Sequence, residues 1–357
     1  MIHFIVSFTD NADATPMGQA LRSLGVPHAF YARRVSMNYR NRLQLLLLRL
    51  PRLLLHAIAA AHWSFVRAPV RAQTVVVSSD LEALVFGLFR WWYRREVKIA
   101  LLGFILTLRS KPWLDALRLR YFRWVFGAAD LVLVYSGLEL KRYNSLFPAS
   151  KAKFRFLHYG LHMWAHEQEH DFVEPDRGPI LTAGRSGRDY ALLTRVLART
   201  PRQLRIVCDN AAALEGCARS PNITVLSACH GNDYVNELRA AGIVIVPLSV
   251  DDVSAGQMVL MQAMAYRKPV IITRTTTVTE YVDEDSGVLL VPMGDGEALA
   301  RAIARLCDQP ALARSLAERA YATYAASFSM EAFMERLCRT LNAPATVAGG
   351  GAVARAQ

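Results

Sequence analysis

The chain has 357 residues, 53% hydrophobic and 20% charged, which suffices for two globular domains and is too apolar for general disorder. Five scattered cysteines argue against a disulfide framework and a zinc site, and they indicate a reducing compartment. Residues 1–160 hold 23 Lys/Arg and 8 Asp/Glu (+15), whereas the remainder holds 19 and 22 (−3). So basic a first half predicts an anionic partner.

The first long apolar stretch, 43–65, has the length of a membrane span. Arg49, Pro51 and Arg52 interrupt its middle, where buried charge is costly, so a span is not expected. Instead, the pattern favours a pair of amphipathic helices lying on an anionic membrane surface. A core helix with solvated arginines is one alternative, and a nucleic-acid surface, which also interleaves aromatic and basic residues, is another.

Short apolar runs alternate with longer helical patterns through the first half of the chain. Strands are predicted at 2–8, 74–79, 97–104, 131–136 and 154–159. Helices are predicted to begin near Asp80, Trp113 and Gly137. Continuous apolar strands separated by helices predict a parallel sheet that is covered on both faces.

The same alternation of strands and helices resumes after a polar segment. Strands are predicted at 179–184, 204–209, 223–228, 243–249, 269–274 and 288–292. Helices are predicted at 189–199, 233–241, after 256, and at 278–283, 295–308, 310–326 and 330–341. The chain is therefore predicted to be α/β, with two Rossmann-like, doubly wound domains. We expect the domains at 1–165 and 179–327, a linker at 166–178, and a disordered tail at 343–357.

Ligands of doubly wound sheets bind at the carboxyl ends of the strands, and the loop 183–190 follows such a strand. Gly184 permits a tight turn and close approach of a ligand. Arg185 and Arg188 supply positive charge suited to phosphate, and Asp189 is a candidate N-cap. The alternative is a capped turn with surface arginines.

A second loop, 253–257, enters an apolar helix that opens unusually on Ala-Gly-Gln. Helix-start amides have no intrahelical partners, and the helix dipole favours an anion there. Gln262 lies a turn and a half further, within reach of a ribose hydroxyl; the alternative is an ordinary polar residue on an exposed face. The predicted ligand-binding residues of this loop and helix are Ser254, Ala255, Gly256, Gln257, Met258, Val259 and Gln262.

At these residues the sequence resembles the retaining GT-B glycosyltransferases, specifically family four (group 1) of bacterial polysaccharide and envelope synthesis. The resemblance covers the second domain well. In the first domain it extends only to the alternation of predicted strands and helices. The matching pieces, in order, are Gly184-Arg185, 262–271 (QAMAYRKPVI), Glu280, 287–292 (GVLLVP) and 328–330 (FSM).

The resemblance implies transfer of a sugar from a UDP- or GDP-linked donor, with no metal or other cofactor required in principle. Arg185 and Arg188 would stabilise the departing diphosphate together with the amides of Gln257, Met258 and Val259. Gln262 would hold the ribose, and Glu280 would contact the sugar or brace the loop.

Some positions depart from the family pattern. Family members usually have glutamates where Ser254 and Gln262 stand, so both contacts lose their charge. The family's phosphate-binding lysine falls on Ala191, for which Arg188 is the expected substitute. The usual Gly-Gly pair after the next strand is replaced by Thr275, Thr276 and Thr277.

The function favoured is transfer to a lipid-linked or other saccharide acceptor in cell-envelope or exopolysaccharide synthesis, with retention implied by the resemblance alone. The basic first half would bind the anionic inner face of the cell membrane, which makes the protein cytoplasmic and peripheral, with no nucleic acid as partner. The helix 328–342 is expected to pack back onto the first domain, as in relatives. A catalytically silent GT-B subunit, a sugar-nucleotide epimerase or hydrolase, and a nucleic-acid-binding protein are the alternatives.

Overall fold

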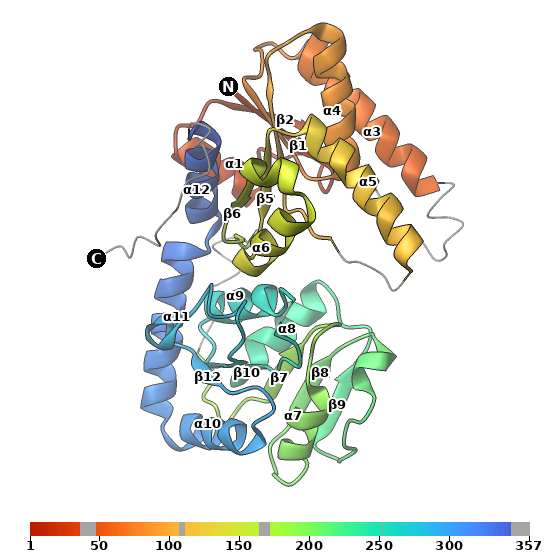
Figure 1. Cartoon of the computed structure of the whole chain (residues 1–357). Helices are drawn as coiled ribbons and strands as arrows, with labels where there is room; N and C mark the ends of the chain where they lie inside the picture. Colours follow the sequence, from red (N-terminus) through yellow and green to blue (C-terminus); the bar gives the residue numbers. More distant parts are fainter. Residues whose placement is uncertain (36–47, 107–110, 164–171, 252, 344–357) are drawn as a thin grey trace. The chain divides into compact units, whose positions relative to one another are not determined.

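A computed structural model describes residues 1–35, 48–106, 111–163, 172–251 and 253–343 (Figure 1). The chain folds into two compact units. Unit 1 comprises Met1–Leu157 and Met334–Gln357, and unit 2 comprises His158–Phe333. The chain therefore leaves unit 1 after its last strand and returns to it within the C-terminal helix α12 (Met330–Asn342).

Unit 1 is built on a six-stranded parallel sheet with the order β2-β1-β3-β4-β5-β6. Its strands are β1 (Ile2–Val6), β2 (His28–Ala32), β3 (Thr74–Val77), β4 (Lys98–Leu102), β5 (Leu131–Val134) and β6 (Phe154–Phe156). Its helices are α1 (Pro16–Ser23), α3 (Leu50–His62), the π-helix η2 (Trp63–Arg67), α4 (Asp80–Tyr93), α5 (Pro112–Ala128), α6 (Gly137–Leu146) and the 3-10 helix η3 (Pro148–Lys153).

The helices of unit 1 cover both faces of this sheet. The apolar sides of α3, α4, α5 and α6 form one core with alternate residues of the central strands. Helix α1 lies on the other side of the sheet together with the end of α12 (Figure 1). Lys98 Nζ donates to Leu341 O at 2.6 Å, which holds the end of α12 beside β4.

Unit 2 has a second six-stranded parallel sheet, ordered β12-β11-β10-β7-β8-β9. Its strands are β7 (Ile180–Ala183), β8 (Leu204–Val207), β9 (Ile223–Leu226), β10 (Ile243–Val246), β11 (Val270–Thr273) and β12 (Leu289–Val291). The helices are α7 (Tyr190–Leu197), α8 (Asn232–Ala240), α9 (Gln257–Ala265), α10 (Gly296–Asp308) and α11 (Pro310–Ser327), with the 3-10 helices η5 (Ala211–Leu214) and η6 (Glu284–Ser286). Helices α8, α9 and α11 share one core, and α7 and α10 share the core on the other face.

The α/β class and the two Rossmann-like sheets are as predicted, and every predicted strand is present in a shorter form. The short helix expected at 278–283 is wrong. Residues 276–281 form turns. Thr279 N and Val282 N donate to Thr275 O and Val278 O with i+4 spacing, but Tyr281 N donates to Val278 O with i+3 spacing, so the chain makes successive turns rather than a regular helix.

Two elements were not predicted, namely α1 and β2. Helix α1 is only eight residues long, and β2 is an edge strand of sequence HAFYA in which every residue is only half-buried. Residues 43–47 of the expected pair of amphipathic helices lie outside the described residues. The remainder is α3 followed by η2, and Pro51 lies in the first turn of α3, where its missing N–H costs no hydrogen bond.

Candidate functional site

The two loops singled out in the sequence follow neighbouring strands of unit 2. In this sheet β8 and β9 follow β7 on one side. The next strand in the sequence, β10, lies on the other side of β7. The reversal lies between β7 and β10, and a crevice at the carboxyl ends of such strands is where doubly wound sheets bind ligands. Loop 184–189 follows β7 and loop 247–256 follows β10, so both border this crevice.

The first loop folds around the guanidinium group of Arg188. Its Nε donates to Ala183 O at 2.9 Å, and its Nη1 donates to Ser186 O at 3.1 Å. Gly184 has φ +132°, and a Cβ at that position would lie 2.5 Å from Nη2 of Arg188. Burial lowers the pKa of Arg188 below its usual range. The loop therefore fixes a partly desolvated positive charge beside a residue that must be glycine.

Arg185 is placed differently. Its side chain is 73% exposed, and its Nε lies 2.7 Å from an Asp209 carboxylate oxygen. Asn210 Nδ2 donates to the backbone carbonyl of Arg185 at 2.8 Å. The residues after β8 thus hold Arg185 at the surface, with its charge already partnered by a carboxylate.

Backbone contacts join the first loop to the second. Asp189 N donates to Pro247 O at 3.0 Å, and Ser249 N donates to Gly187 O at 3.1 Å. A Cβ on Gly187 would lie 3.4 Å from the Cβ of Ala255. The structure therefore brings 184–188 and 255–256 together, and Ser254 lies half-buried in the same loop.

Helix α9 starts at this junction. Its N-cap is Gly256 with φ +90°, a conformation that favours glycine, and no side chain of the described residues caps the helix. The sequence of its first turn contains no acidic residue. The amides of Gln257, Met258 and Val259 therefore head the helix, and within the described ranges no side chain caps the positive end of its dipole.

Gln257 itself is buried, with 8% of its surface exposed, and its Nε2 donor has no hydrogen-bond partner among the residues that the structure describes. An unsatisfied buried donor carries a free-energy cost, so it indicates a group that is completed by a ligand or by water. The next residue, Met258, is 54% exposed, whereas Val259 is buried against the core.

Gln262 is engaged by a residue that sequence reasoning missed. Tyr234, on α8, donates its hydroxyl to Gln262 Oε1 at 3.0 Å. Burial raises the pKa of Tyr234, and the nearby charge of Arg188 opposes that rise. Tyr234 thus lies between the predicted ribose contact and the predicted phosphate contact. One tyrosine in a polar helix carries no sequence signal for such a role.

Glu280 lies half-buried in the loop that follows β11. Its carbonyl oxygen is 2.7 Å from His158 Nε2, and the His158 ring packs at right angles to Tyr281. The start of this loop is tied to the loop after β10, because Thr276 donates its hydroxyl to Asp251 at 3.0 Å. These contacts place Glu280 on the loop next to the crevice, and they give His158 a structural contact.

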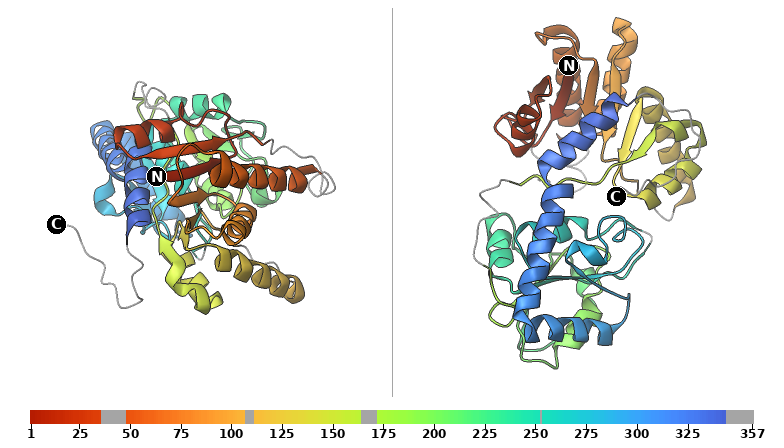
Figure 2. Two further views of the ribbon diagram at one scale, coloured as in Figure 1. Left: turned by 90° about the horizontal axis from the view of Figure 1, so that it is seen from above. Right: turned by 90° about the vertical axis from the view of Figure 1, so that its left-hand side faces the viewer.

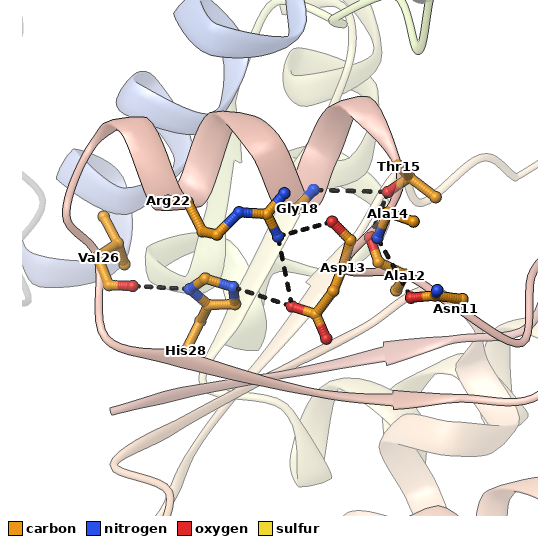
Figure 3. Close-up of polar contacts among 9 residues, drawn as sticks. All are labelled: Asn11, Ala12, Asp13, Ala14, Thr15, Gly18, Arg22, Val26 and His28. Atoms are coloured by element: carbon orange, nitrogen blue, oxygen red, sulfur yellow. Dashed lines mark hydrogen bonds and ion pairs between the residues drawn. The ribbon is translucent and has the colours of Figure 1, made fainter.

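In unit 1, a polar loop joins the first strand, β1, to the first helix, α1 (Figure 3). Thr15 caps α1, since its hydroxyl accepts from Gly18 N. The Asp13 carboxylate lies 3.8 Å from Arg22 and 3.7 Å from His28, which links the loop to the last turn of α1 and to the start of β2. Gly18 packs against the backbone of the loop, where a Cβ would lie 2.5 Å from Asp13 O.

The comparisons with known proteins agree with this description. Residues 190–309 match the family described as "Glycosyl transferases group 1". No curated protein sequence matches the chain. Among solved structures, sucrose-phosphate synthase from Thermosynechococcus elongatus is 20% identical, with a TM-score of 0.64 over 95% of this chain and 98% of that chain.

Two further structures have the same architecture. The α,α-trehalose-phosphate synthase (UDP-forming) from Burkholderia vietnamiensis is 11% identical, with a TM-score of 0.63 over 95% of this chain and 99% of that one. Anabaena HepE in complex with UDP is 13% identical, with a TM-score of 0.60 over 95% and 99%.

Two Rossmann-like units with this topology define the GT-B fold. The segment that matches the group 1 glycosyltransferase family, 190–309, contains the second loop, all of α9 and Glu280. The chain therefore has the GT-B fold, and its likeness to the group 1 glycosyltransferases lies in the segment 190–309. The individual roles of the eleven predicted site residues stay predictions.

Proposed function

We propose that unit 2 binds a nucleoside diphosphate sugar at the crevice between β7 and β10. This proposal is carried by three features of the two neighbouring loops. Arg188 is held in a fixed position, the start of α9 has no side-chain cap, and the Gln257 amide has no hydrogen-bond partner among the described residues. These are three kinds of donor suited to diphosphate oxygens. UDP, named with the similar structure of HepE, supports a uridine donor, and GDP is the alternative.

The reaction follows from where these charges lie. As the bond between the sugar and the diphosphate breaks, negative charge grows on the diphosphate. Arg188 and the head of α9 are already oriented and partly desolvated, so they stabilise this charge without rearrangement. Gln262, held by Tyr234, positions the ribose, and Glu280 contacts the sugar or braces the loop. Family likeness alone supports retention of the anomeric configuration.

The proposed acceptor is a lipid-linked saccharide at the inner face of the cell membrane, in envelope or exopolysaccharide synthesis. The +15 charge of residues 1–160 supports an anionic surface as partner. Across the described ranges, no helix has both the length and the apolar character to cross a bilayer. The protein is proposed to be peripheral on the cytoplasmic side.

A catalytically silent subunit is the second candidate. Neither Ser254 nor Gln262 carries the carboxylate that the resembled family has at these positions. In that case nucleotide binding would persist without transfer.

The test is thermal stabilisation of the purified protein by a panel of nucleoside diphosphates and their sugars. One base should raise the melting temperature by several degrees at about a hundredfold excess over Kd. Arg188→Ala should abolish the shift, and Arg185→Ala should reduce it less, because Asp209 already partners Arg185. A well-folded protein that responds to no nucleotide would refute the donor site.

A hit leads to the second arm, in which transfer to polyprenyl-diphosphate saccharides is followed by mass spectrometry. The anomeric configuration of the product is then read by NMR. Tight binding without turnover on any acceptor favours the silent subunit. Turnover of the donor without an acceptor favours an epimerase or hydrolase.

A further inference from the structure

The exposed apolar side chains of this protein are concentrated in one region. Of the 21 large hydrophobic residues exposed in the described ranges, 15 lie between Leu48 and Trp124 of unit 1, and only four lie in unit 2. Scattered exposed leucines need no explanation, but a concentration of this kind marks an interaction surface.

Six of these residues are exposed on three neighbouring helices, and together we call them the tryptophan patch: Leu55, Trp91, Trp92, Trp113, Leu117 and Trp124. Helix α4 contacts both α3 and α5, and the three lie next to one another on the same side of the sheet (Figures 1 and 2). On α5, the patch residues recur at four- and seven-residue spacing, which places them on one face of the helix.

The fold does not need these side chains. The opposite faces of the same helices fill the core of unit 1, through Ala60 on α3, Phe86 on α4 and Phe126 on α5. Trp91 and Trp92 are 71% and 72% exposed, and Trp113 and Trp124 are both 63% exposed. Keeping four such rings in water is unfavourable unless a partner covers them.

The charges around the patch identify the partner. Residues 48–127 contain 13 Lys/Arg and 4 Asp/Glu, a net charge of +9. Arg52, Arg94, Arg120 and Arg123 are exposed on the same three helices or at their ends. The Arg120 guanidinium lies 5.8 Å from the centre of the Trp124 ring. Indole rings bordered by arginine suit the boundary between acyl chains and anionic headgroups.

We propose that the tryptophan patch docks unit 1 onto an anionic lipid bilayer. The indoles and leucines enter the headgroup boundary while the arginines contact lipid phosphates. This inference rests on the proposed function for its purpose, since a lipid-linked acceptor lies in that surface. Binding itself needs neither donor nor acceptor and is tested without them.

The experiment is sedimentation of the full chain with phosphatidylcholine vesicles, with and without phosphatidylglycerol. Tryptophan emission is recorded in parallel, with and without lipids brominated on the acyl chain. The wild type should bind the anionic vesicles, shift its emission to the blue, and be quenched by bromine. Trp91→Ser with Trp92→Ser, and separately Trp113→Ser with Trp124→Ser, should each lower the partition coefficient by about tenfold or more.

Two controls make the result specific. Val225→Ser with Met293→Ser removes exposed apolar side chains from unit 2 and should leave vesicle binding unchanged. Arg120→Gln with Arg123→Gln should weaken binding only to vesicles that contain phosphatidylglycerol. A nucleotide should still stabilise every patch variant. Vesicle binding without nucleotide stabilisation would therefore refute the donor site alone, and nucleotide stabilisation without vesicle binding would refute the patch alone.

Three outcomes would overturn the proposal. One is failure of the wild type to bind anionic vesicles. Another is a concentration-dependent dimer that both tryptophan pairs abolish while vesicle binding is unaffected. The third is tight, salt-sensitive binding of single-stranded RNA through the patch without any lipid response.

Discussion

Replacing Gly184 by alanine tests the geometry of the phosphate loop directly. The residue has φ +132°, and an added Cβ would meet the Nη2, Cζ and Nε atoms of Arg188 at 2.5 to 2.7 Å. The guanidinium has little room to retreat, because it donates to Ala183 O and Ser186 O. Gly184→Ala therefore strains the backbone and also pushes Arg188 out of position.

These two effects have separable magnitudes. The backbone strain costs about 1–3 kcal/mol. Breaking one charged hydrogen bond of Arg188 adds about 1.5–3 kcal/mol, so a total loss of about 2.5–6 kcal/mol in the free energy of unfolding is expected. Gly294 has φ +74° with no described atom within 4 Å of an added Cβ, so Gly294→Ala shows the strain alone, about 1–2 kcal/mol.

The assay is urea unfolding followed by circular dichroism for both glycine variants, for Arg188→Ala, and for the double variant Gly184→Ala with Arg188→Ala. Removing Arg188 abolishes the collision, so the double variant should be more stable than the sum of the single effects by about 1.5–3 kcal/mol. Gly184→Ala should also lose stabilisation by nucleotide. A cost no greater than that of Gly294→Ala, together with additivity in the double variant, would refute the reasoning.

Two further predictions concern buried polar groups of unit 2. Tyr234→Phe removes the hydrogen bond to Gln262 and should weaken nucleotide binding by about tenfold in titration calorimetry, at a stability cost of about 1–2 kcal/mol; unchanged affinity would exclude a positioning role. Lys268 is fully buried, and burial lowers its pKa to about 8 from an ordinary 10.5. Between these two pH values the unfolded chain therefore binds more protons than the folded chain. Stability should therefore rise with pH across this window by up to about 1.4 kcal/mol per pH unit relative to Lys268→Met, as followed by urea midpoints; parallel pH profiles for the two proteins would contradict it.

Hydrophobic periodicity encodes much of the fold, and those parts could be predicted from the sequence. Buried parallel strands such as β5 and β10 are continuous apolar runs, and a strand of this kind has few alternatives. Strand β2 is half-buried at the sheet edge, so its residues lack that signal. The segment after β11 has a helical pattern, but its backbone bonds mix i+3 and i+4 spacing at Val278 O, so it makes successive turns instead of a regular helix.

Less of the candidate site could be predicted. Glycines and arginines after a strand locate the loops, because backbone geometry and charge have local signatures. What each side chain contacts depends on distant residues. Asp209 partners Arg185 and Tyr234 engages Gln262, and neither pairing has a spacing that sequence can encode. Sequence therefore predicts the same role for Arg185 and Arg188, whereas the structure anchors Arg188 on the backbone of its own loop and leaves Arg185 at the surface.

The neutral residues at 254 and 262 bear on whether the site is catalytic. A neutral hydrogen bond contributes about 0.5–1.5 kcal/mol and a charged one about 1.5–3, so Gln262 in place of glutamate lowers ribose affinity by roughly tenfold. Stabilisation of the departing diphosphate is the larger contribution to the rate, and its candidate groups remain: Arg188, the first amides of α9 and the Gln257 side chain, which is unsatisfied within the described residues. A silent subunit that still bound nucleotide would use the same groups, so turnover with an acceptor, and not binding, distinguishes the two candidates. Where turnover is found, the balance of these contributions predicts a transferase with a weakened hold on its donor.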